Sequence, residues 1–339
     1  MSNDRIVCFG ELLLRLSAPG RELLFQSPCL DVQFGGAEAN VATSLAILGH
    51  ASAMISALPD NAPGRAARDA LRRHGVDTRG IGFAEGRMGL YFLAPGAMQR
   101  PAEVTYDRAD SVFARTSAAD YDWPQLMAGA SWLHVSGINL ALNERTAEAA
   151  LAAVLAARAA GAAVSFDCNY RGRLWDLRAA QAPALLRQIA AEADLLLGNE
   201  RDIALMLGAE FRDAGGEQRF LAAAQLAFRS FPRLRWMATT ERAIQDVDTH
   251  ELCGHLATRE HVLTTRTHRL TGIVDRIGSG DAFAAGLLHG LITGLHQPAA
   301  LDFAVAAACL KHSIAGDANL SRAADMLAFL EQDGIDVQR

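Results

Sequence analysis

The chain has 339 residues, and 50% of them are hydrophobic, which is enough to form a substantial buried core. Its 38 acidic residues outnumber its 32 lysines and arginines, so the formal net charge is -6. This balance provides no basic face for nucleic acid or for an anionic membrane, and we expect neither as a partner. A small metabolite is the ligand class that this composition favours.

Short apolar runs alternate with helical patterns along the chain. The runs lack clean polar–apolar alternation, which is typical of strands buried on both faces of a parallel sheet. They are RIVCFG (5–10), ASAMISAL (51–58), ASWLHVSGI (130–138), AAVSFDCNY (162–170), ADLLLGNE (193–200) and RLRWMATT (233–240). Apolar spacing at i, i+3, i+4 and i+7 predicts helices over 37–49, 143–160, 179–193, 281–294 and 297–313. The pattern predicts an α/β fold with a doubly wound, mostly parallel sheet flanked by helices.

Two stretches interrupt this alternation, residues 12–35 and 87–110. Both contain strand-like pieces separated by Pro-Gly turns and no convincing helix. Because no linker, repeat or low-complexity tract divides the chain, we expect one domain over 1–339 with these stretches inserted as a small β lid. Lid strands with open edges often pair across a two-fold axis, so a homo-oligomer, a dimer or larger, is expected.

The N-terminal stretch MSNDRIVCFGELLLRL lacks the basic and cleavable apolar segments of a secretory signal. The most apolar longer window, 148–166, carries Arg158, which argues against a membrane span. These features predict a cytoplasmic protein.

The cysteines are odd in number and far apart, so we expect reduced core thiols rather than disulfides. They are Cys8, Cys29, Cys168, Cys253 and Cys309. Four histidines, His250, His255, His261 and His268, fall in one stretch without HExxH or paired-cysteine spacing. The sequence therefore does not predict a structural zinc site.

The segment VDRIGSGDAFAAG (274–286) places two glycines before an acid at the start of a helical pattern. The backbone amides of Gly278, Ser279 and Gly280 can converge at this helix N-terminus, where they favour a bound anion such as phosphate. The same helix field favours the ionised form of Asp281, which is then available to accept a proton. An acid after glycine at a helix start is also an ordinary N-cap, so the segment alone leaves both interpretations open.

Together with FGGAEANVATSLAILG (34–49), this segment resembles the two signature regions of the ribokinase-like carbohydrate kinase family. The motifs GGAEAN, YDRADS, FDCNYRGRLW, GNE and LKHSIAGD extend the resemblance over nearly the whole chain, and are most similar to the kinases for 2-keto-3-deoxygluconate. The resemblance implies transfer of a phosphoryl group from ATP, with Mg²⁺, to the terminal hydroxyl of a sugar acid. Asp281 would be the base, and the amides of 278–281 would form the anion hole.

Gly35 and Gly36 open the first helix, where missing side chains let a polyol approach the backbone, although a tight turn explains them too. The resemblance favours sugar binding here and adds Asn40 as a partner for a sugar hydroxyl. Tyr106 and Arg108 face one side of a strand, because they are two residues apart.

The resemblance implies that Tyr91, in the other half of the same hairpin, joins Tyr106 and Arg108 in contacting substrate. An arginine fork suits the carboxylate of a keto-deoxy sugar acid. The alternative is a surface arginine balanced by Asp107 and Asp110.

Asn169 and Arg171 follow a buried strand, where α/β sheets bind ligands. By resemblance, Asn169 binds the nucleotide and Arg171 contacts both substrate and nucleotide. The resemblance also implies that Asn199 lies near the phosphates and that Glu200 holds Mg²⁺ through a bound water. An ordinary capping acid in a first helical turn is the alternative for Glu200.

The resemblance implies a substrate contact from Asp317 in AGDANL, a segment that a helix stop at Gly316 also explains. Thr239 is the expected nucleotide contact of the segment MATTERAIQDVDTHE (237–251). This segment departs from many family members, which carry a glycine-rich nucleotide loop where this chain has no glycine before Gly254.

Three other functions fit parts of the sequence. A kinase for a neutral sugar, such as ribose or fructose, would use the arginines only for structure. A non-catalytic sugar-acid sensor would account for the missing nucleotide glycines. A dehydrogenase fits least well, because the third glycine of GxGxxG would fall at Phe283.

Overall fold

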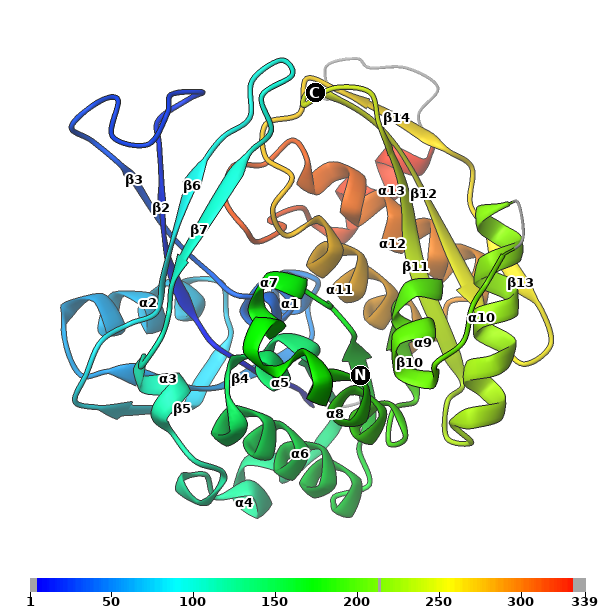
Figure 1. Cartoon of the computed structure of the whole chain (residues 1–339), viewed down its shortest axis with the longest axis horizontal. Helices are drawn as coiled ribbons and strands as arrows, with labels where there is room; N and C mark the ends of the chain where they lie inside the picture. The colour runs from blue at the N-terminus through cyan, green and yellow to red at the C-terminus, as the bar shows by residue number, and fades with distance from the viewer. Residues whose placement is uncertain (1–4, 213–214, 332–339) are drawn as a thin grey trace.

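The computed structural model describes residues 5–212 and 215–331 and contains two β-sheets, the larger one flanked by helices (Figure 1). The ten-stranded sheet has the order β13-β12-β11-β10-β9-β8-β1-β4-β5, with β14 beside β12. Its strands are β1 (Arg5–Phe9), β4 (Ala51–Pro59), β5 (Asp77–Ala84), β8 (Ala130–Ser136), β9 (Ala163–Asp167), β10 (Leu195–Leu197), β11 (Trp236–Ile244), β12 (Thr249–Ala257), β13 (Val262–Thr264) and β14 (His268–Thr271).

Every strand pair from β5 to β11 is parallel, whereas β12 runs antiparallel to β11 and to both β13 and β14. The mostly parallel sheet predicted from the buried apolar runs is therefore confirmed. Side chains from its central strands, including Phe9, Val135 and Phe166, are fully buried between the helical layers. Covered faces explain why these strands read as continuous apolar runs.

The helices predicted from periodicity are present, with ends shifted by a few residues. The α-helices are α1 (Ala37–Ile47), α2 (Ala62–Arg73), α3 (Val112–Arg115), α4 (Trp123–Met127), α5 (Gly137–Leu142), α6 (Glu144–Ala159), α7 (Gly172–Trp175), α8 (Ala182–Ala190), α9 (Glu200–Leu207), α10 (Gly216–Ser230), α11 (Ser279–Ile292), α12 (Gln297–Lys311) and α13 (Ala323–Glu331). The helix predicted over 179–193 begins as a 3-10 turn, Asp176–Gln181, and becomes α8 where Pro183 stands in its first turn. Proline fits this position because it lacks an N–H, and the N–H groups of a first helical turn have no intrahelical acceptor.

The four-stranded sheet contains β2 (Leu13–Ser17), β3 (Asp31–Gly35), β6 (Leu90–Ala94) and β7 (Glu103–Asp107), in the order β3-β2-β6-β7. Each of the two predicted insertions supplies two of these strands, so the small β lid is confirmed. The blue and cyan strands project at the upper left of Figure 1, away from the main sheet. Strands β3 and β7 are the edges of this sheet, where another copy of the chain could pair. Homo-oligomer formation stays a prediction.

In the described ranges, no helix is both long and apolar enough to cross a membrane. The prediction of one domain over 1–339 includes residues 1–4, 213–214 and 332–339, which lie outside the described residues, and it stays a prediction. The expectation that every cysteine lies in the core is wrong for Cys29, which is exposed on the lid-side loop, and Cys253 is only partly buried.

Candidate active site

A cavity of about 500 Å³ lies between the small sheet and the carboxyl ends of the main-sheet strands. Its wall includes Tyr91 from β6, Asp167 from β9 and Thr240 from β11. The cavity-lining residues that the sequence singled out are Gly36, Asn40, Tyr91, Tyr106, Arg108, Asn169, Arg171, Gly278, Ser279, Gly280, Asp281 and Asp317. Segments far apart in the sequence therefore meet at one site, as expected for the carboxyl edge of a parallel sheet.

Helix α11 begins at this cavity with Gly278 as its N-cap residue. Gly278 has φ of 81°, and a Cβ there would lie 1.8 Å from the carbonyl oxygen of Asp317, so no other residue fits without displacing the backbone. The first N–H groups of a helix have no intrahelical partners. The N–H of Ser279 donates to the carbonyl oxygen of Arg276 at 3.4 Å, so the free donors here are the later N–H groups of the first turn. These residues and the positive end of the helix dipole lie at the cavity wall, and anion binding there stays a prediction.

Asp281 lies in the first turn of α11, and Asn40 from α1 donates a hydrogen bond to its Oδ2 at 2.7 Å. Burial raises the pKa of Asp281 to about 6, against the bond from Asn40 and the charge of Arg171, which both lower it. The sequence led us to expect the helix field to dominate and to favour the ionised form. Desolvation dominates instead, but a pKa near 6 still leaves the carboxylate mostly ionised at neutral pH.

Asp167 lies near both Asp281 and Asp202, whose charges act on it. Burial, followed by the charges of Asp281 and Asp202, raises the pKa of Asp167 to about 8. Burial also raises the pKa of Asp202 to about 6, although its Oδ2 accepts a hydrogen bond from the backbone N–H of Asn199. The end of β9 and the start of α11 therefore bring together carboxyl groups whose ionisation is disfavoured by burial and by mutual repulsion.

Asp317 ties the lid to the α11 loop. Its Oδ1 accepts from Nη1 of Arg15 in β2 at 2.6 Å, and its Oδ2 accepts from the Tyr91 hydroxyl at 2.5 Å. Arg15 also bonds Asp275 through Nη2 at 2.7 Å. Burial lowers the pKa of Arg15, but the carboxylates Asp275 and Asp317 outweigh burial and raise it. A buried, satisfied ion-pair network thus holds β2, β6 and the 275–281 loop together.

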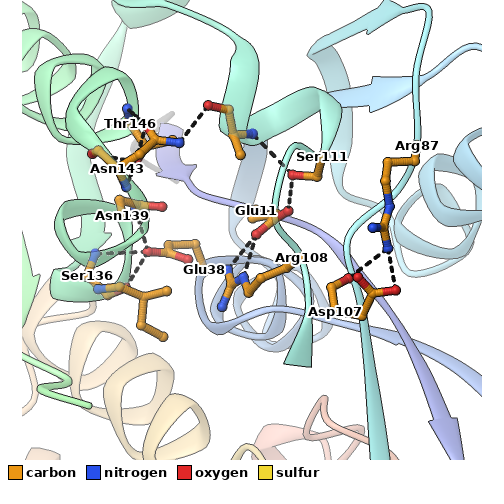
Figure 2. A network of polar contacts seen from close by, with 12 residues as sticks. Glu11, Glu38, Arg87, Asp107, Arg108, Ser111, Ser136, Asn139, Asn143 and Thr146 are labelled. Atoms are coloured by element: carbon orange, nitrogen blue, oxygen red, sulfur yellow. Dashed lines mark hydrogen bonds and ion pairs between the residues drawn. The ribbon is translucent and has the colours of Figure 1, made fainter. Parts of the chain in front are cut away.

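Arg108, directly after β7, is already paired within the chain, as Figure 2 shows. Its Nε and Nη2 donate to Oε2 of Glu11 at 2.8 and 2.5 Å, and the Ser111 hydroxyl donates to Oε1 of Glu11 at 2.6 Å. Both charged side chains are almost completely buried. The Nη1 edge of Arg108 makes no hydrogen bond to any described residue and remains for a ligand in the cavity.

Glu38 in α1, like Glu11, accepts several hydrogen bonds in the network of Figure 2. Its Oε1 accepts from the backbone N–H and the hydroxyl of Ser136 at 2.9 and 2.6 Å, and from Nδ2 of Asn139 at 2.9 Å. Burial nevertheless raises the pKa of Glu38 to about 7. These bonds anchor α1 to the end of β8 and fix the helix that carries Asn40.

Asn169 and Arg171 follow β9 at the cavity. Asn169 adopts a positive φ of 38°, which asparagine tolerates better than most residues, and its N–H donates to Oδ1 of Asp167. The Nε of Arg171 donates to Oδ1 of Asn169 at 2.9 Å. This tight turn presents the guanidinium of Arg171 toward the carboxyl group of Asp281, whose pKa it lowers.

Four candidates from the sequence do not line the cavity: Gly35, Asn199, Glu200 and Thr239. Gly35 packs against Asp317, while Asn199 caps α9. Glu200 in the first turn of α9 lies 3.8 Å from Nε of Arg219. Strand alternation in β11 places Thr240 on the cavity wall and Thr239 on the opposite face.

Glu11 and Asp167 line the cavity but were not candidates from the sequence. Glu11 follows β1 after Gly10, and Asp167 is the last residue of β9. The strand-end position that singled out Asn169 would also have identified both carboxylates. Arg242 and Arg276 line the cavity too, but nothing in their local sequence indicates this.

Comparison with known proteins identifies the family of this chain. The model of the family described as pfkB family carbohydrate kinase matches residues 3–229 and 259–324. This chain belongs to the pfkB family of carbohydrate kinases. The unmatched stretch between these two ranges, 230–258, contains the whole of β11 and β12, where the sequence departs from the family's glycine-rich pattern.

Relatives of this kinase act on sugar acids and on neutral sugars, according to their names. A crystal structure of 2-dehydro-3-deoxygluconokinase from Thermotoga maritima is 34% identical, with a TM-score of 0.93 over 97% of this chain and 100% of that one. A 2-dehydro-3-deoxygalactonokinase from Haloferax volcanii is 32% identical over 92% of both chains. A fructokinase from Klebsiella pneumoniae is 31% identical over 85% of both chains.

Proposed function

We propose that this kinase transfers the γ-phosphoryl group of ATP to the terminal hydroxyl of 2-keto-3-deoxygluconate or a closely related sugar acid, forming the 6-phosphate. The observation that carries the proposal is the juxtaposition, in one cavity, of the partly buried Asp281 at a helix N-terminus with Arg108 and Arg171. The likeness to sugar-acid kinases from Thermotoga maritima and Haloferax volcanii supports the substrate class.

Asp281 is the proposed general base. The bond from Asn40 to Oδ2 orients the carboxylate, so Oδ1 is available for the proton of the attacking hydroxyl. With a pKa of about 6, the group is ionised at neutral pH and basic enough to contribute to proton removal. We therefore expect kcat/KM to fall about tenfold per pH unit below about pH 6, where Asp281 becomes protonated.

The α11 amides are the proposed anion hole. The N–H groups between Gly278 and Asp281 would stabilise the charge that develops on the transferred phosphoryl oxygens. Because Gly278 fixes the loop against Asp317, these donors are arranged before substrate binds. Preorganised dipoles need no reorganisation during the reaction, which is the physical basis of their contribution.

The α11 side of the cavity fits Mg²⁺. Asp167 is a buried carboxyl group whose pKa is raised by burial and by Asp281 and Asp202, and a divalent cation would relieve that repulsion. We propose that Asp167 would hold the ion, and that Glu200, which lies outside the cavity wall, would reach it only through a bound water. Bound Mg²⁺ would supply neutralisation of phosphate charge.

Arg108 and Arg171 are the proposed partners of the substrate carboxylate, with Tyr91 and Tyr106 along the lid. Glu11 occupies one edge of the Arg108 guanidinium and leaves Nη1 for the ligand. A charge-assisted bond from a fixed guanidinium favours an acid over a neutral sugar of the same size.

A kinase for a neutral sugar is the second candidate, because Glu11 already compensates the charge of Arg108 within the chain. Similarity to the Klebsiella pneumoniae fructokinase supports this alternative.

ADP release coupled to NADH oxidation, measured over aldonic acids, keto-deoxy acids, ribose and fructose, tests both candidates. We expect the highest kcat/KM on 2-keto-3-deoxygluconate or its galactonate epimer. Faster turnover of fructose or ribose would replace the first candidate by the second. Binding of a sugar acid by calorimetry without ADP release on any sugar would instead support a non-catalytic sensor.

A further inference from the structure

Glu241, Cys253 and His255 form a cluster on the β11–β12 hairpin, outside the cavity. In the antiparallel register, Glu241 lies opposite Cys253, and His255 is two residues further along β12. Side chains opposite one another or two apart on a strand share a face of the sheet. Strand pairing therefore brings three side chains together from positions with no recognisable metal-binding spacing.

The three potential ligand atoms lie within 4.8 Å of one another. Nε2 of His255 is 3.1 Å from Oε2 of Glu241 and 3.9 Å from Sγ of Cys253. In a tetrahedral zinc site with bonds of about 2.0–2.3 Å, ligand atoms are separated by roughly 3.3–3.8 Å. Small side-chain rotations would bring this cluster into that range.

The imidazole of His255 is held for coordination through Nε2. Its Nδ1 lies 3.0 Å from the hydroxyl of Thr264 in β13, and that hydroxyl donates to Oε2 of Glu217 in α10 at 3.2 Å. Because the Thr264 hydroxyl proton is directed to Glu217, its oxygen accepts a hydrogen bond from Nδ1–H of His255. Nε2 faces Cys253 and Glu241, where it would use its lone pair to bind a cation in place of its contact with Glu241. Such a chain, in which the second ring nitrogen donates to a hydrogen-bonded acceptor, is typical of metal-ligating histidines.

Burial fixes the ring further, because the side chain of His255 is only 4% exposed and packs 5.5 Å from the ring of Phe220. Glu241 is 57% exposed at the opposite end of the cluster. One side of the cluster is therefore rigid and the other opens to solvent, so an ion can enter and keep a water as its fourth ligand.

We propose that Glu241, Cys253 and His255 bind Zn²⁺ or a cation of similar chemistry, such as Co²⁺. Thiolate and imidazole ligands select these borderline metals, whereas Mg²⁺ requires oxygen ligands. On coordination, the Cys253 thiol loses its proton to solvent and Sγ forms the bond to the metal.

The site is separate from the proposed reaction centre. Thr240, Arg242 and Leu252 of the same two strands line the cavity, so the cluster occupies the opposite face of the hairpin. An ion there would join β11 to β12 directly and to α10 through Thr264 and Glu217. Its expected effect is to stabilise the hairpin, because any ligand bound only by the folded state does so.

Titration with Co²⁺ tests the proposal in the full chain after reduction and removal of metal with a chelator. We expect visible tetrahedral bands and a thiolate-to-cobalt charge-transfer band, at one ion per chain. Cys253→Ser should lose the charge-transfer band, whereas Cys29→Ser, which changes an exposed cysteine outside the cluster, should retain it. Wild-type spectra from Cys253→Ser, or no cobalt bands in the wild type, would overturn the proposal.

Zn²⁺ affinity, measured by competition with a chromophoric chelator, provides a second test. Glu217→Leu should weaken binding about tenfold, because it removes the acceptor that orients the Thr264 hydroxyl and, through it, His255, and Glu241→Gln should weaken it more. Glu241 is exposed, so its variant is expected to fold, as circular dichroism can verify. Equal affinity of Glu241→Gln and the wild type would refute this ligand set, whatever the kinase activity.

Discussion

Charges are compensated differently on the two sides of the cavity: the lid wall, formed by the small sheet and Arg108, and the α11 wall, formed by α1, the end of β9 and the start of α11. On the lid wall, each buried arginine has its counter-ion within the chain: Arg15 pairs with Asp275 and Asp317, and Arg108 pairs with Glu11. Such pairs fix positions, because removing one partner would leave a buried charge without compensation.

On the α11 wall, carboxyl groups outweigh their compensation. Burial raises the pKa values of Asp281, Asp167 and Glu38, and the hydrogen bonds and the charge of Arg171 offset this only in part. The difference indicates a division of labour. Under the proposed function, the balanced wall would position the substrate, and the unbalanced wall would hold the groups that change protonation or bind the cation.

Replacing the proposed base tests this division most directly. Asp281→Asn should lower kcat by about 10²- to 10⁴-fold, because the variant cannot accept the hydroxyl proton. Its melting temperature should stay the same or rise, since a partly buried charge is removed. Pre-steady-state and steady-state ADP release measure the first effect, and calorimetry measures the second. Near-normal turnover by a folded variant would remove Asp281 from the base role.

Uncompensated burial on the α11 wall also predicts a pH-dependent stability. The pKa of Glu38 is raised from 4.5 to about 7, so its stabilising contribution is present below pH 4.5 and is lost as the pH rises through 7. Relative to Glu38→Gln, the wild type should therefore lose roughly 3 kcal/mol of unfolding free energy between pH 4.5 and pH 8. Urea unfolding at a series of pH values measures it, and parallel curves for the two proteins would contradict it.

Substitutions on the lid wall should change the preference of the enzyme for a sugar acid over a neutral sugar. Arg108→Lys keeps a cation for Glu11 but loses the planar fork, so kcat/KM for the sugar acid should fall about tenfold to a hundredfold. Turnover of a neutral sugar should change much less. Arg87→Lys is the matched control, since Arg87 forms an exposed ion pair with Asp107 at the same end of the hairpin as Arg108. Equal losses on acid and neutral sugars would show that Arg108 does not recognise the carboxylate.

The smallest effect is expected where the lid meets the β11–β12 turn. Arg21 makes a two-bond ion pair with Asp248 at 2.7 and 2.8 Å, but both side chains are substantially exposed. Arg21→Ala should raise KM for the sugar no more than about fivefold and leave kcat unchanged, because solvent screens the pair. A larger rise would mean that this contact controls lid closure.

Local features of the site followed from the sequence. The glycine pair before Asp281 predicted a helix N-terminus with free amides, and the structure places Gly278 and Asp281 there. Helical periodicity identified the five predicted helices, continuous apolar runs identified the central strands, and Pro-Gly turns between strand-like pieces identified the lid insertions. These patterns are readable because the conformation of a turn or helix depends on neighbouring residues.

Pairing between distant side chains was decided only by the tertiary structure. Arg15 and Asp317 are 302 positions apart, and Arg108 and Glu11 are 97 apart, so no local pattern connects them. The pKa of Asp281 likewise depends on burial, which exceeded the helix field expected from sequence. Thr240 faces the cavity, and Glu241 faces Cys253, because of the register between β11 and β12. Sheet order and register arise from packing of the whole core, and a shift of one residue would turn each of these side chains to the other face.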